Sequence, residues 1–468
     1  MRYFSTRGRA PVLSFDDVLL TGLARDGGLY LPESWPQLSP DDLHQLSGAP
    51  YAEVARRVMA PFVAGSVIEK DFGQLVEEAY AGFEHASVTP LRQLDPDLWL
   101  MDLFHGPTLA FKDVALQLLG RLFDAVLEAR GERLTIVGAT SGDTGSAAIE
   151  ACRDRERVDI FILHPHGRTS EVQRRQMTTV EAPNVHNIAV EGTFDDCQDL
   201  VKAMFNDGGF RDRLQLSAVN SINWARIMAQ IVYYVQAAVS LGAPDRRVSF
   251  AVPTGNFGNV FAGYAARRMG VPIERLVVGS NRNDILTRFF ENGVMAVEDV
   301  YPTLSPSMDI QVSSNFERLL CDLYERDGAR VNATLEDFRR EGRFRIDPAL
   351  FDEMPFEGHR LDDEETLAEI RRAYQAYGAL IDPHTAIGVA AARRAQARRA
   401  EVPSVALATA HPAKFPDAVH KATGVRPELP ERLADLYERR EHYVTLPNEL
   451  GRLQTYIQGH ARITKDAA

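Results

Sequence analysis

The interpretation of this chain starts from residues 103–113, Leu-Phe-His-Gly-Pro-Thr-Leu-Ala-Phe-Lys-Asp, whose central residue for function is Lys112. The Gly106-Pro107 pair indicates a turn, and the apolar residues after Asp113 predict a helix. A lysine at the mouth of a buried helix loses solvation, which lowers the pKa of its ammonium group. Schiff-base chemistry with an aldehyde cofactor requires such a neutral amine. The ordinary alternative is that Lys112 pairs with Asp113 or extends to solvent.

The composition is that of a globular protein with more than one domain. The 468 residues suffice for two or three domains, and 45% hydrophobic and 25% charged residues are ordinary values. A net charge of −13 argues against binding to nucleic acid or to an anionic membrane. Cys152, Cys197 and Cys321 are widely spaced and are expected to be free thiols. Without a signal core or a long apolar run, the chain is expected to be cytoplasmic.

Strands alternate with helices from about residue 96 onward. Strands are expected at 98–104, 134–137, 158–164, 185–190, 248–252, 276–279 and 405–409. This alternation predicts an α/β fold with a mostly parallel sheet covered on both faces. The expected domains are an N-terminal domain at 1–95, an α/β domain at 96–230, a second α/β domain at 231–420 with a peripheral insertion at about 290–365, and a helical tail at 421–468.

A glycine-rich loop between an expected strand and an expected helix has the composition of a phosphate site. The loop consists of Gly255, Asn256, Phe257, Gly258 and Asn259. Glycines allow backbone N–H groups to close around an anion, and the N-terminus of the helix adds its positive end. The spacing is neither that of a GxGxxG fingerprint nor that of a P-loop, so a tight turn is the ordinary alternative.

Two further stretches offer donors to anions. The first is a strand-to-helix loop rich in hydroxyl groups, which contains Thr140, Ser141, Asp143 and Thr144. The second is the start of an expected helix, where Ser221 and Arg226 suit a phosphate group. The ordinary alternatives are helix capping for the first stretch and a surface ion pair for Arg226.

Two anion loops and a lysine in an apolar run together indicate a cofactor with a phosphate and an aldehyde, acting on a second anion. Pyridoxal 5′-phosphate meets this description. Thr409, at the end of an expected strand, offers the pyridine nitrogen a neutral hydrogen-bond partner. A neutral partner leaves that nitrogen largely unprotonated, unlike an aspartate.

The chain resembles the threonine synthase family, pyridoxal-phosphate enzymes of fold type II, over nearly its whole length. The resemblance is carried by residues 3–8, 21–30, 105–113, 139–145, 220–226, 253–259, 382–385 and 409–415. The Phe-Lys-Asp and Thr-Ala-His-Pro-Ala-Lys-Phe segments are its most specific parts, and the long middle region is similar to the bacterial and fungal form. The resemblance implies two open, mostly parallel twisted sheets with helices on both faces, as in tryptophan synthase β, and an N-terminal, mainly helical domain.

The resemblance also implies a role for each candidate residue. Lys112 would carry pyridoxal 5′-phosphate as a Schiff base and move protons, residues 255–259 would hold the cofactor phosphate, and Thr409 would meet the pyridine nitrogen. The loop with Thr140, Ser141, Asp143 and Thr144 would bind the substrate carboxylate, with the substrate phosphate as an alternative ligand, and Ser221 with Arg226 would hold the substrate phosphate. Related enzymes often carry asparagine at the position of Asp143.

The reaction implied is a carbon–oxygen lyase reaction, the last step of threonine biosynthesis. O-phospho-L-homoserine and water become L-threonine and phosphate by γ-elimination and β-addition. A serine/threonine dehydratase or a phospholyase of the same fold is the nearest alternative, and a non-catalytic nucleotide-binding protein is a more distant one. His164 and His166 show no third ligand, so no metal site is expected. A monomer or a homodimer is expected.

Overall fold

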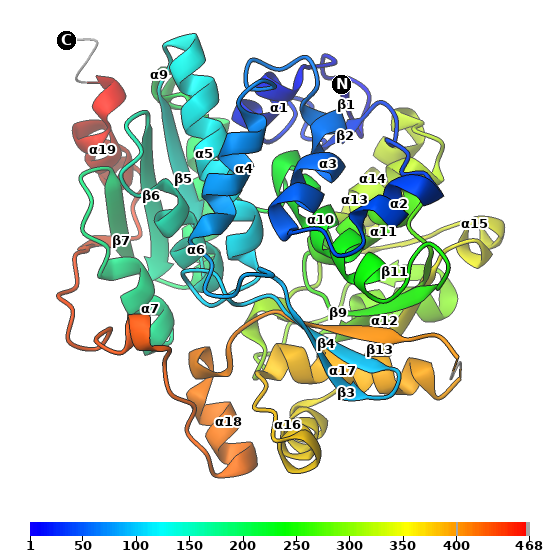
Figure 1. Ribbon diagram of the computed structural model, residues 1–468. Helices are drawn as coiled ribbons and strands as arrows, with labels where there is room; N and C mark the ends of the chain where they lie inside the picture. The colour runs from blue at the N-terminus through cyan, green and yellow to red at the C-terminus, as the bar shows by residue number, and fades with distance from the viewer. Residues whose placement is uncertain (399–400, 465–468) are drawn as a thin grey trace.

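The computed structural model describes residues 1–398 and 401–464, and two sheets of mostly parallel strands form the framework of the protein (Figure 1). The larger sheet has six strands in the order β13-β10-β9-β14-β4-β3. These strands are β3 (Leu91–Asp95), β4 (Leu98–Asp102), β9 (Val248–Pro253), β10 (Ile273–Ser280), β13 (Phe356–Arg360) and β14 (Ser404–Ala408). Neighbouring strands are parallel except for β3 and β4, which are antiparallel.

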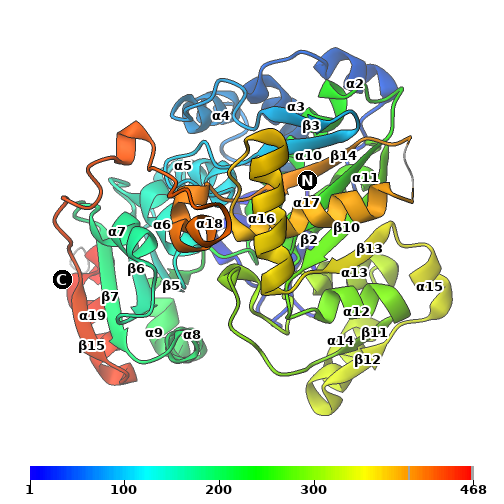
Figure 2. The same cartoon turned by 90° about the horizontal axis from the view of Figure 1, so that it is seen from below.

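The smaller sheet has five strands in the order β15-β7-β6-β5-β8, and all neighbours are parallel. Its strands are β5 (Leu134–Ala139), β6 (Val158–Pro165), β7 (Val185–Glu191), β8 (Leu216–Ser217) and β15 (Val444–Pro447). Figure 2 shows this sheet on one side of the molecule and the larger sheet on the other. Parallel strands need crossovers, and the chain uses helices for most of them.

Helices cover both faces of each sheet because the side chains of a strand alternate between its faces. In β14, Val405 and Leu407 join the large core that contains α10 (Trp224–Ser240) and α11 (Gly258–Arg268). Ala406 and Ala408 point to the other face, where they join a smaller core with α16 (Asp363–Tyr377) and α17 (Pro383–Gln396). Both faces of this strand are therefore buried, as is typical of a parallel sheet.

The smaller sheet is covered in the same way. Its faces pack against α5 (Lys112–Arg130) and α6 (Asp143–Cys152) in the large core, and against α8 (Phe194–Asn206), α9 (Gly208–Leu214) and α19 (Leu450–His460) in a separate core. The helix α7 (Glu171–Thr178) packs beside α6. Helices α8, α9 and α19 lie on the outer side in Figure 2.

The N-terminal unit is mainly helical and rests on the two central helices α5 and α10. It contains a two-stranded antiparallel ribbon of β1 (Tyr3–Ser5) and β2 (Tyr30–Pro32). Its helices are α1 (Phe15–Thr21), α2 (Pro40–Leu46), α3 (Tyr51–Val63) and α4 (Phe72–Ala81). Contacts of α3 with α10 and of α4 with α5 attach this unit to the sheets.

The remaining elements lie mainly between β10 and β14 and after β14. They are α12 (Ile285–Asn292), β11 (Val294–Ala296), η1 (Pro306–Met308), α13 (Phe316–Leu323), α14 (Gly328–Glu341), β12 (Arg343–Arg345), α15 (Pro348–Asp352), η2 (Pro412–Lys414), α18 (Pro416–Thr423), η3 (Glu431–Leu433) and η4 (Arg462–Thr464). Strands β11 and β12 form a separate antiparallel pair.

The predicted fold of two open, mostly parallel sheets with helices on both faces is confirmed. The structure corrects two details. β13 lies within the range expected to be a peripheral insertion, yet it pairs with β10 in the larger sheet. β15 lies in the tail that was expected to be helical, yet it pairs with β7 in the smaller sheet. The division into four domains stays a prediction, and residues 465–468 of the expected tail lie outside the described residues.

Among the described residues, no helix combines the length and apolar character that a membrane span requires. The same part of the chain contains no cluster of three or more His, Cys, Asp or Glu side chains arranged to hold a metal ion. Cys152, Cys197 and Cys321 are buried and free, as expected.

Candidate active site

The segment before Lys112 is fixed against the end of strand β14. The Phe111 N–H donates to the Thr409 carbonyl at 2.9 Å, and Ala110 and Ala410 form an antiparallel bridge. Leu109 adopts a left-handed φ of 64°, which is unusual for a branched, fully buried side chain. The fold therefore brings Thr409 next to Lys112, although 297 positions separate them in the sequence. Backbone strain is stored at Leu109, in the segment directly before Lys112.

The alternative that Lys112 pairs with Asp113 or extends to solvent is wrong. Its side chain is only 11% exposed, and its Nζ lies 3.3 Å from Oδ2 of Asp143. Asp113 instead accepts hydrogen bonds from the backbone N–H and the hydroxyl of Thr108, at 2.8 and 2.7 Å. Burial lowers the pKa of Lys112, the Asp143 carboxylate opposes this shift, and the cations Lys414 and Arg226 add to it. The lysine is therefore desolvated in the way that imine chemistry requires.

Asp143 joins Lys112 to a second buried lysine, Lys414. The Lys414 Nζ lies 2.9 Å from Oδ1 of Asp143, and the Gln173 amide donates to the same oxygen at 2.8 Å. Burial works to raise the pKa of Asp143, but Lys414, Lys112 and the Gln173 amide hold it below its ordinary value. Asp143 is thus a carboxylate whose two oxygens face cations, and its side chain is not free to bind another anion.

The rest of the loop before α6 divides into structural and open positions. The Thr140 hydroxyl oxygen accepts the N–H groups of Gly142 and Gly145, both at 2.9 Å, so this side chain caps its own loop. Ser141 is exposed and Thr144 is half-buried. Gly142 precedes α6 with φ of 149° and provides no side-chain cap of its own, and Thr140 takes up the N–H of Gly145 in the first turn of the helix. The hydroxyl groups of Ser141 and Thr144 and the start of α6 therefore remain as donors for an anion.

The loop 255–259 has the features of a phosphate cradle. Helix α11 starts at Gly258 without a side-chain cap from any described residue, and Phe257 precedes it with a left-handed φ of 63°. A Cβ atom on Gly255 would lie 2.7 Å from the Ser307 carbonyl oxygen, so only glycine fits this approach. The buried Asn259 is held through its Oδ1 by the hydroxyls of Tyr233 and Tyr234, at 2.5 and 2.9 Å.

Ser221 lies against this loop rather than apart from it. A Cβ atom on Gly258 would lie 3.3 Å from Cβ of Ser221 and 3.2 Å from the Asn315 amide nitrogen. The Asn315 amide donates to the hydroxyl oxygen of Ser221 at 3.0 Å and to the carbonyl of Asn256 at 3.1 Å. The two predicted phosphate stretches are therefore neighbours in space, joined by Asn315.

Arg226 is a buried cation at the start of α10. Its side chain donates to the Val219 carbonyl at 2.9 Å, while its buried Nε has no hydrogen-bond partner within the described part of the chain. Burial lowers the pKa of Arg226 to about 10. A desolvated guanidinium with an unused donor is a strong candidate to bind an anionic group.

Known proteins are similar to this chain in sequence and fold. Family models match residues 2–80 (threonine synthase N terminus), 83–342 (pyridoxal-phosphate dependent enzyme) and 385–457 (threonine synthase, C-terminal). The threonine synthase of Pseudomonas aeruginosa is 58% identical over 98% of both chains. The chain belongs to the threonine synthase family. The function, lyase class and cofactor expected from the resemblance are thereby confirmed.

Solved structures of threonine synthases confirm the fold. The pyridoxal-phosphate-bound threonine synthase from Brucella melitensis is 55% identical, has a TM-score of 0.95, and is matched over 99% of this chain and 100% of its own. The yeast threonine synthase is 39% identical, with a TM-score of 0.92 and 98% coverage of both chains. Both agree with the predicted fold type II.

The residues of this threonine synthase fit pyridoxal phosphate on structural grounds alone. The uncapped start of α11 and its glycine loop suit a phosphate, and the desolvated Lys112 suits an aldehyde. Thr409 lies directly after the core strand β14 and accepts from Phe111, the neighbour of Lys112. The unused Nε of Arg226 suits a second anion. The donor set therefore matches both the cofactor and a phosphorylated substrate.

Several polar residues that complete this site were not predicted. Lys414, Gln173, Asn315 and Arg318 contact predicted residues from segments 30 to 271 positions away. Lys414 stood within a family segment but was assigned no role. Long-range contacts leave no local pattern, so only the family segment around Lys414 carried a usable signal.

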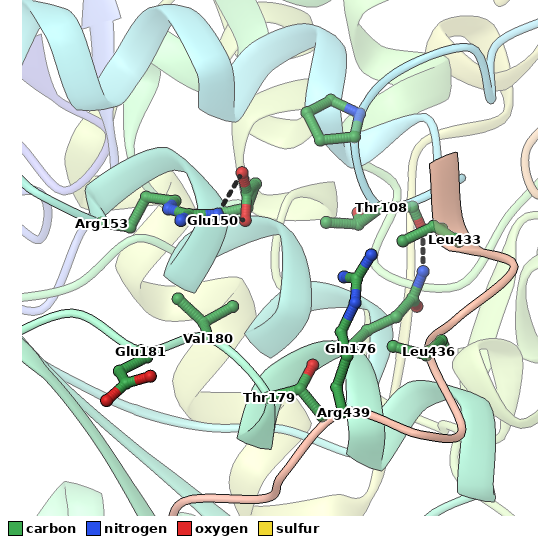
Figure 3. A pocket seen from close by; sticks show the side chains of 11 residues that line it. Thr108, Glu150, Arg153, Gln176, Thr179, Val180, Glu181, Leu433, Leu436 and Arg439 are labelled. Carbon is green, nitrogen blue, oxygen red and sulfur yellow. Dashed lines mark hydrogen bonds and ion pairs between the residues drawn. The ribbon is translucent and has the colours of Figure 1, made fainter. Parts of the chain in front are cut away.

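A cavity of about 260 Å³ is lined by Thr108 and Gln176 together with residues outside the candidate site (Figure 3). It is bordered by α6, α7 and the chain around Leu433–Arg439, with Arg439 extending into the view beside Gln176. Thr108 lines this cavity, and its carbonyl accepts the Gln176 amide at 3.0 Å. None of the residues predicted to be catalytic or to bind cofactor or substrate lines it.

Proposed function

We propose that Lys112 is the catalytic residue for conversion of O-phospho-L-homoserine and water to L-threonine and phosphate. The observation that supports this role is its desolvated amine, which lies beside Asp143 and next to the end of β14. Bound pyridoxal phosphate supplies an electron-withdrawing ring that accommodates the electron pair left at Cα. The Nζ of Lys112 takes the Cα proton and passes protons to later steps, because it is the basic nitrogen held at that point.

We propose that the loop donors divide the two phosphates between them. Gly255, Asn256, Phe257, Gly258 and Asn259 hold the cofactor phosphate at the start of α11, and Thr409 meets the pyridine nitrogen. Ser221 and Arg226 hold the phosphate that leaves from Cγ before water adds at Cβ. Because Ser221 lies against Gly258, the leaving phosphate departs next to the cofactor phosphate, and neighbouring hydrogen-bond donors bind the two groups.

The substrate carboxylate belongs, in this proposal, to the loop before α6. Ser141 and Thr144 donate their hydroxyls together with the first backbone N–H groups of α6, ahead of the Gly145 N–H that Thr140 accepts. Thr140 and Asp143 support this loop from within, Thr140 through its hydroxyl oxygen and Asp143 through its two cation contacts. In this loop, Ser141 and Thr144 therefore bind the carboxylate, while Thr140 and Asp143 hold the loop in place.

Borohydride reduction followed by peptide mapping tests the role of Lys112. The label is expected on Lys112 alone, and the Lys112→Ala variant is expected to lose the visible absorbance of bound cofactor and about 10³-fold of its activity. Lys202→Ala, which alters an exposed lysine paired with Asp199, serves as the matched control. Label on any other lysine would contradict the assignment.

Product analysis separates this reaction from its nearest alternative. Incubation with O-phospho-L-homoserine is expected to give equal amounts of threonine and phosphate. A phospholyase or dehydratase would instead give 2-oxobutyrate, because the intermediate would be released before water adds at Cβ.

We further propose that the enzyme is cytoplasmic and forms a monomer or a homodimer. Three buried free thiols agree with a reducing compartment. Light scattering of the purified protein gives the oligomeric state, and cell fractionation gives the location. A stable tetramer, or recovery in an extracytoplasmic fraction, would contradict this proposal.

A further inference from the structure

Lys414 is a second buried lysine at the site, and it contacts the same carboxylate as Lys112. It lies in η2, directly after the segment that ends β14, and its side chain is 0% exposed. Its Nζ donates to the Thr108 carbonyl at 2.8 Å and lies 2.9 Å from Oδ1 of Asp143. Thr108 is also the donor that holds Asp113, the neighbour of Lys112.

The local charge balance is unusual for a structural ion pair. Lys112, Lys414 and Arg226 are three buried cations, while Asp143 is the one carboxylate that contacts either lysine among the described residues. Burying an ammonium group costs several kcal/mol, and the cost is offset only when geometry and partners are good. A carboxylate shared by two lysines offsets only part of the cost of burying each ammonium group. This arrangement of Lys112, Asp143 and Lys414 therefore contributes little to the stability of the fold.

We propose that Lys414 is a positioning residue that fixes the Asp143 carboxylate between two lysines and keeps the Lys112 amine ready to accept a proton. The inference rests on the proposed role of Lys112. Lys414 holds Oδ1, which leaves Oδ2 turned to Lys112, and its own positive charge disfavours a second ammonium group beside it.

The charged groups around Lys112 and Lys414 determine in which direction the pKa of Lys112 changes when Lys414 is replaced. Lys112 is faced by Asp143 from α6, Lys414 from η2, Arg226 from α10 and the Phe111 ring 5.0 Å away. The charged or titratable groups that interact with Lys414 are Lys112, Asp113, Asp143 and His411. Lys414 lowers the pKa of Lys112, so removal of its charge must raise that pKa.

The test replaces Lys414 by glutamine, which keeps an amide donor for the Thr108 carbonyl but removes the charge. In Lys414→Gln, the acid limb of the kcat–pH profile is expected to move up by about one pH unit. The pH midpoint of the visible absorbance of bound cofactor is expected to move in the same direction. Lys414→Arg keeps the charge and is expected to restore the native profile, and Lys421→Gln on the exposed side of α18 serves as the matched control.

A second variant supports the test if Lys414→Gln folds poorly. Asp143→Asn removes the opposing negative charge and is expected to move the same acid limb downward, since Asp143 raises the pKa of Lys112. A folded Lys414→Gln protein with an unshifted acid limb, or shifts of the same sign in both variants, would overturn the proposal. Borohydride labelling of Lys414→Gln keeps the two proposals apart: label on Lys112 upholds its role even where the profile fails to move.

Discussion

Arg226 shows, at the scale of one residue, how a site prepared for an anion differs from a stabilising contact. Its guanidinium is buried, one nitrogen donates to a carbonyl, and another has no partner within the described residues. Burial lowers the pKa of Arg226 to about 10, which means that the folded protein disfavours its charge. Such a side chain is retained for binding rather than for folding.

Replacement of Arg226 by methionine should therefore separate stability from function. We expect Arg226→Met to unfold at the same or a higher temperature, because an uncompensated cation leaves the core and a similar volume remains. The kcat/KM for O-phospho-L-homoserine should fall by about 10²-fold, the effect of a lost hydrogen bond to a charged group. Thermal unfolding without ligand and steady-state kinetics measure the two effects. A fall of several degrees in unfolding temperature with little change in kcat/KM would contradict the assignment.

Asp113 gives a pH-dependent prediction of known sign. Burial raises the pKa of Asp113 to about 6, although the Thr108 hydroxyl and N–H act against the shift. Because an unfolded aspartate titrates near 3.9, the folded protein binds the extra proton between about pH 4 and 6. The ionisation of Asp113 therefore lowers the free energy of unfolding as the pH rises through this window, and the loss is complete above it.

The variant Asp113→Asn lacks this titration. Its free energy of unfolding, relative to that of the native protein, should rise by up to about 3 kcal/mol between pH 4 and 7. Urea unfolding of both proteins at pH 4, 5, 6 and 7, without cofactor, measures the difference. A difference that stays constant across these values would show that Asp113 titrates alike in both states.

At the scale of elements, the start of α13 connects three parts of the chain. Arg318 is fully buried and donates to the carbonyls of Tyr30, Ser221 and Ile222 at 3.1, 3.2 and 2.6 Å. It also contacts the amide oxygen of Asn315, which fixes the orientation of that side chain. The Asn315 amide then reaches both phosphate stretches, so α13 sets their separation.

We expect Asn315→Ala to weaken both phosphate sites together. The two hydrogen bonds from the Asn315 amide to the phosphate stretches, of about 1 kcal/mol each, would be lost together with the oxygen that accepts from Arg318. The Kd for pyridoxal phosphate and the KM for the substrate should therefore each rise by about 5- to 10-fold. Titration of the apoprotein with cofactor and steady-state kinetics measure the two constants. Asn332→Ala in α14 serves as the control, because it also removes an amide with two acceptors, which here are the backbone carbonyls of Arg7 and Gly328. A rise in only one constant would contradict a shared support.

The strands β9 and β13 and the start of α13 show which parts of the fold and the site the sequence could predict. Strands such as β9 were predictable because an apolar run precedes a glycine loop and a helix, and this local pattern also located the anion loops. β13 reads Phe-Glu-Gly-His-Arg, a mostly polar edge strand without an apolar run. Asn315 and Arg318 act through contacts with residues 59 to 288 positions away, which no local pattern encodes.

At the scale of the whole molecule, the C-terminal segment closes the smaller sheet. β15 adds the outer strand beside β7, and Leu453, Ile457 and Ala461 bury themselves in the core under this sheet. Arg462 then returns to the amino end of β6, where its Nε lies 2.7 Å from Oδ1 of the buried Asp159. Its Nη2 donates to the carbonyls of Arg155 and Val158, at 3.0 and 2.8 Å. The segment is therefore part of the fold rather than an appendage.

Arg462→Ala tests this closure without disturbing the chemistry. The change leaves Asp159, which is 2% exposed, without its cation, so the free energy of unfolding should fall by about 3 kcal/mol. Arg426→Ala breaks an ion pair whose side chains are 63% and 91% exposed, and should change it by less than about 0.5 kcal/mol. The Arg462 pair lies at the amino end of β6, whereas the substrate loop follows the carboxyl end of β5, so kcat at 25 °C should remain native. Urea unfolding and kinetics measure both quantities, and equal stability losses in the two variants would show that the tail does not hold the sheet.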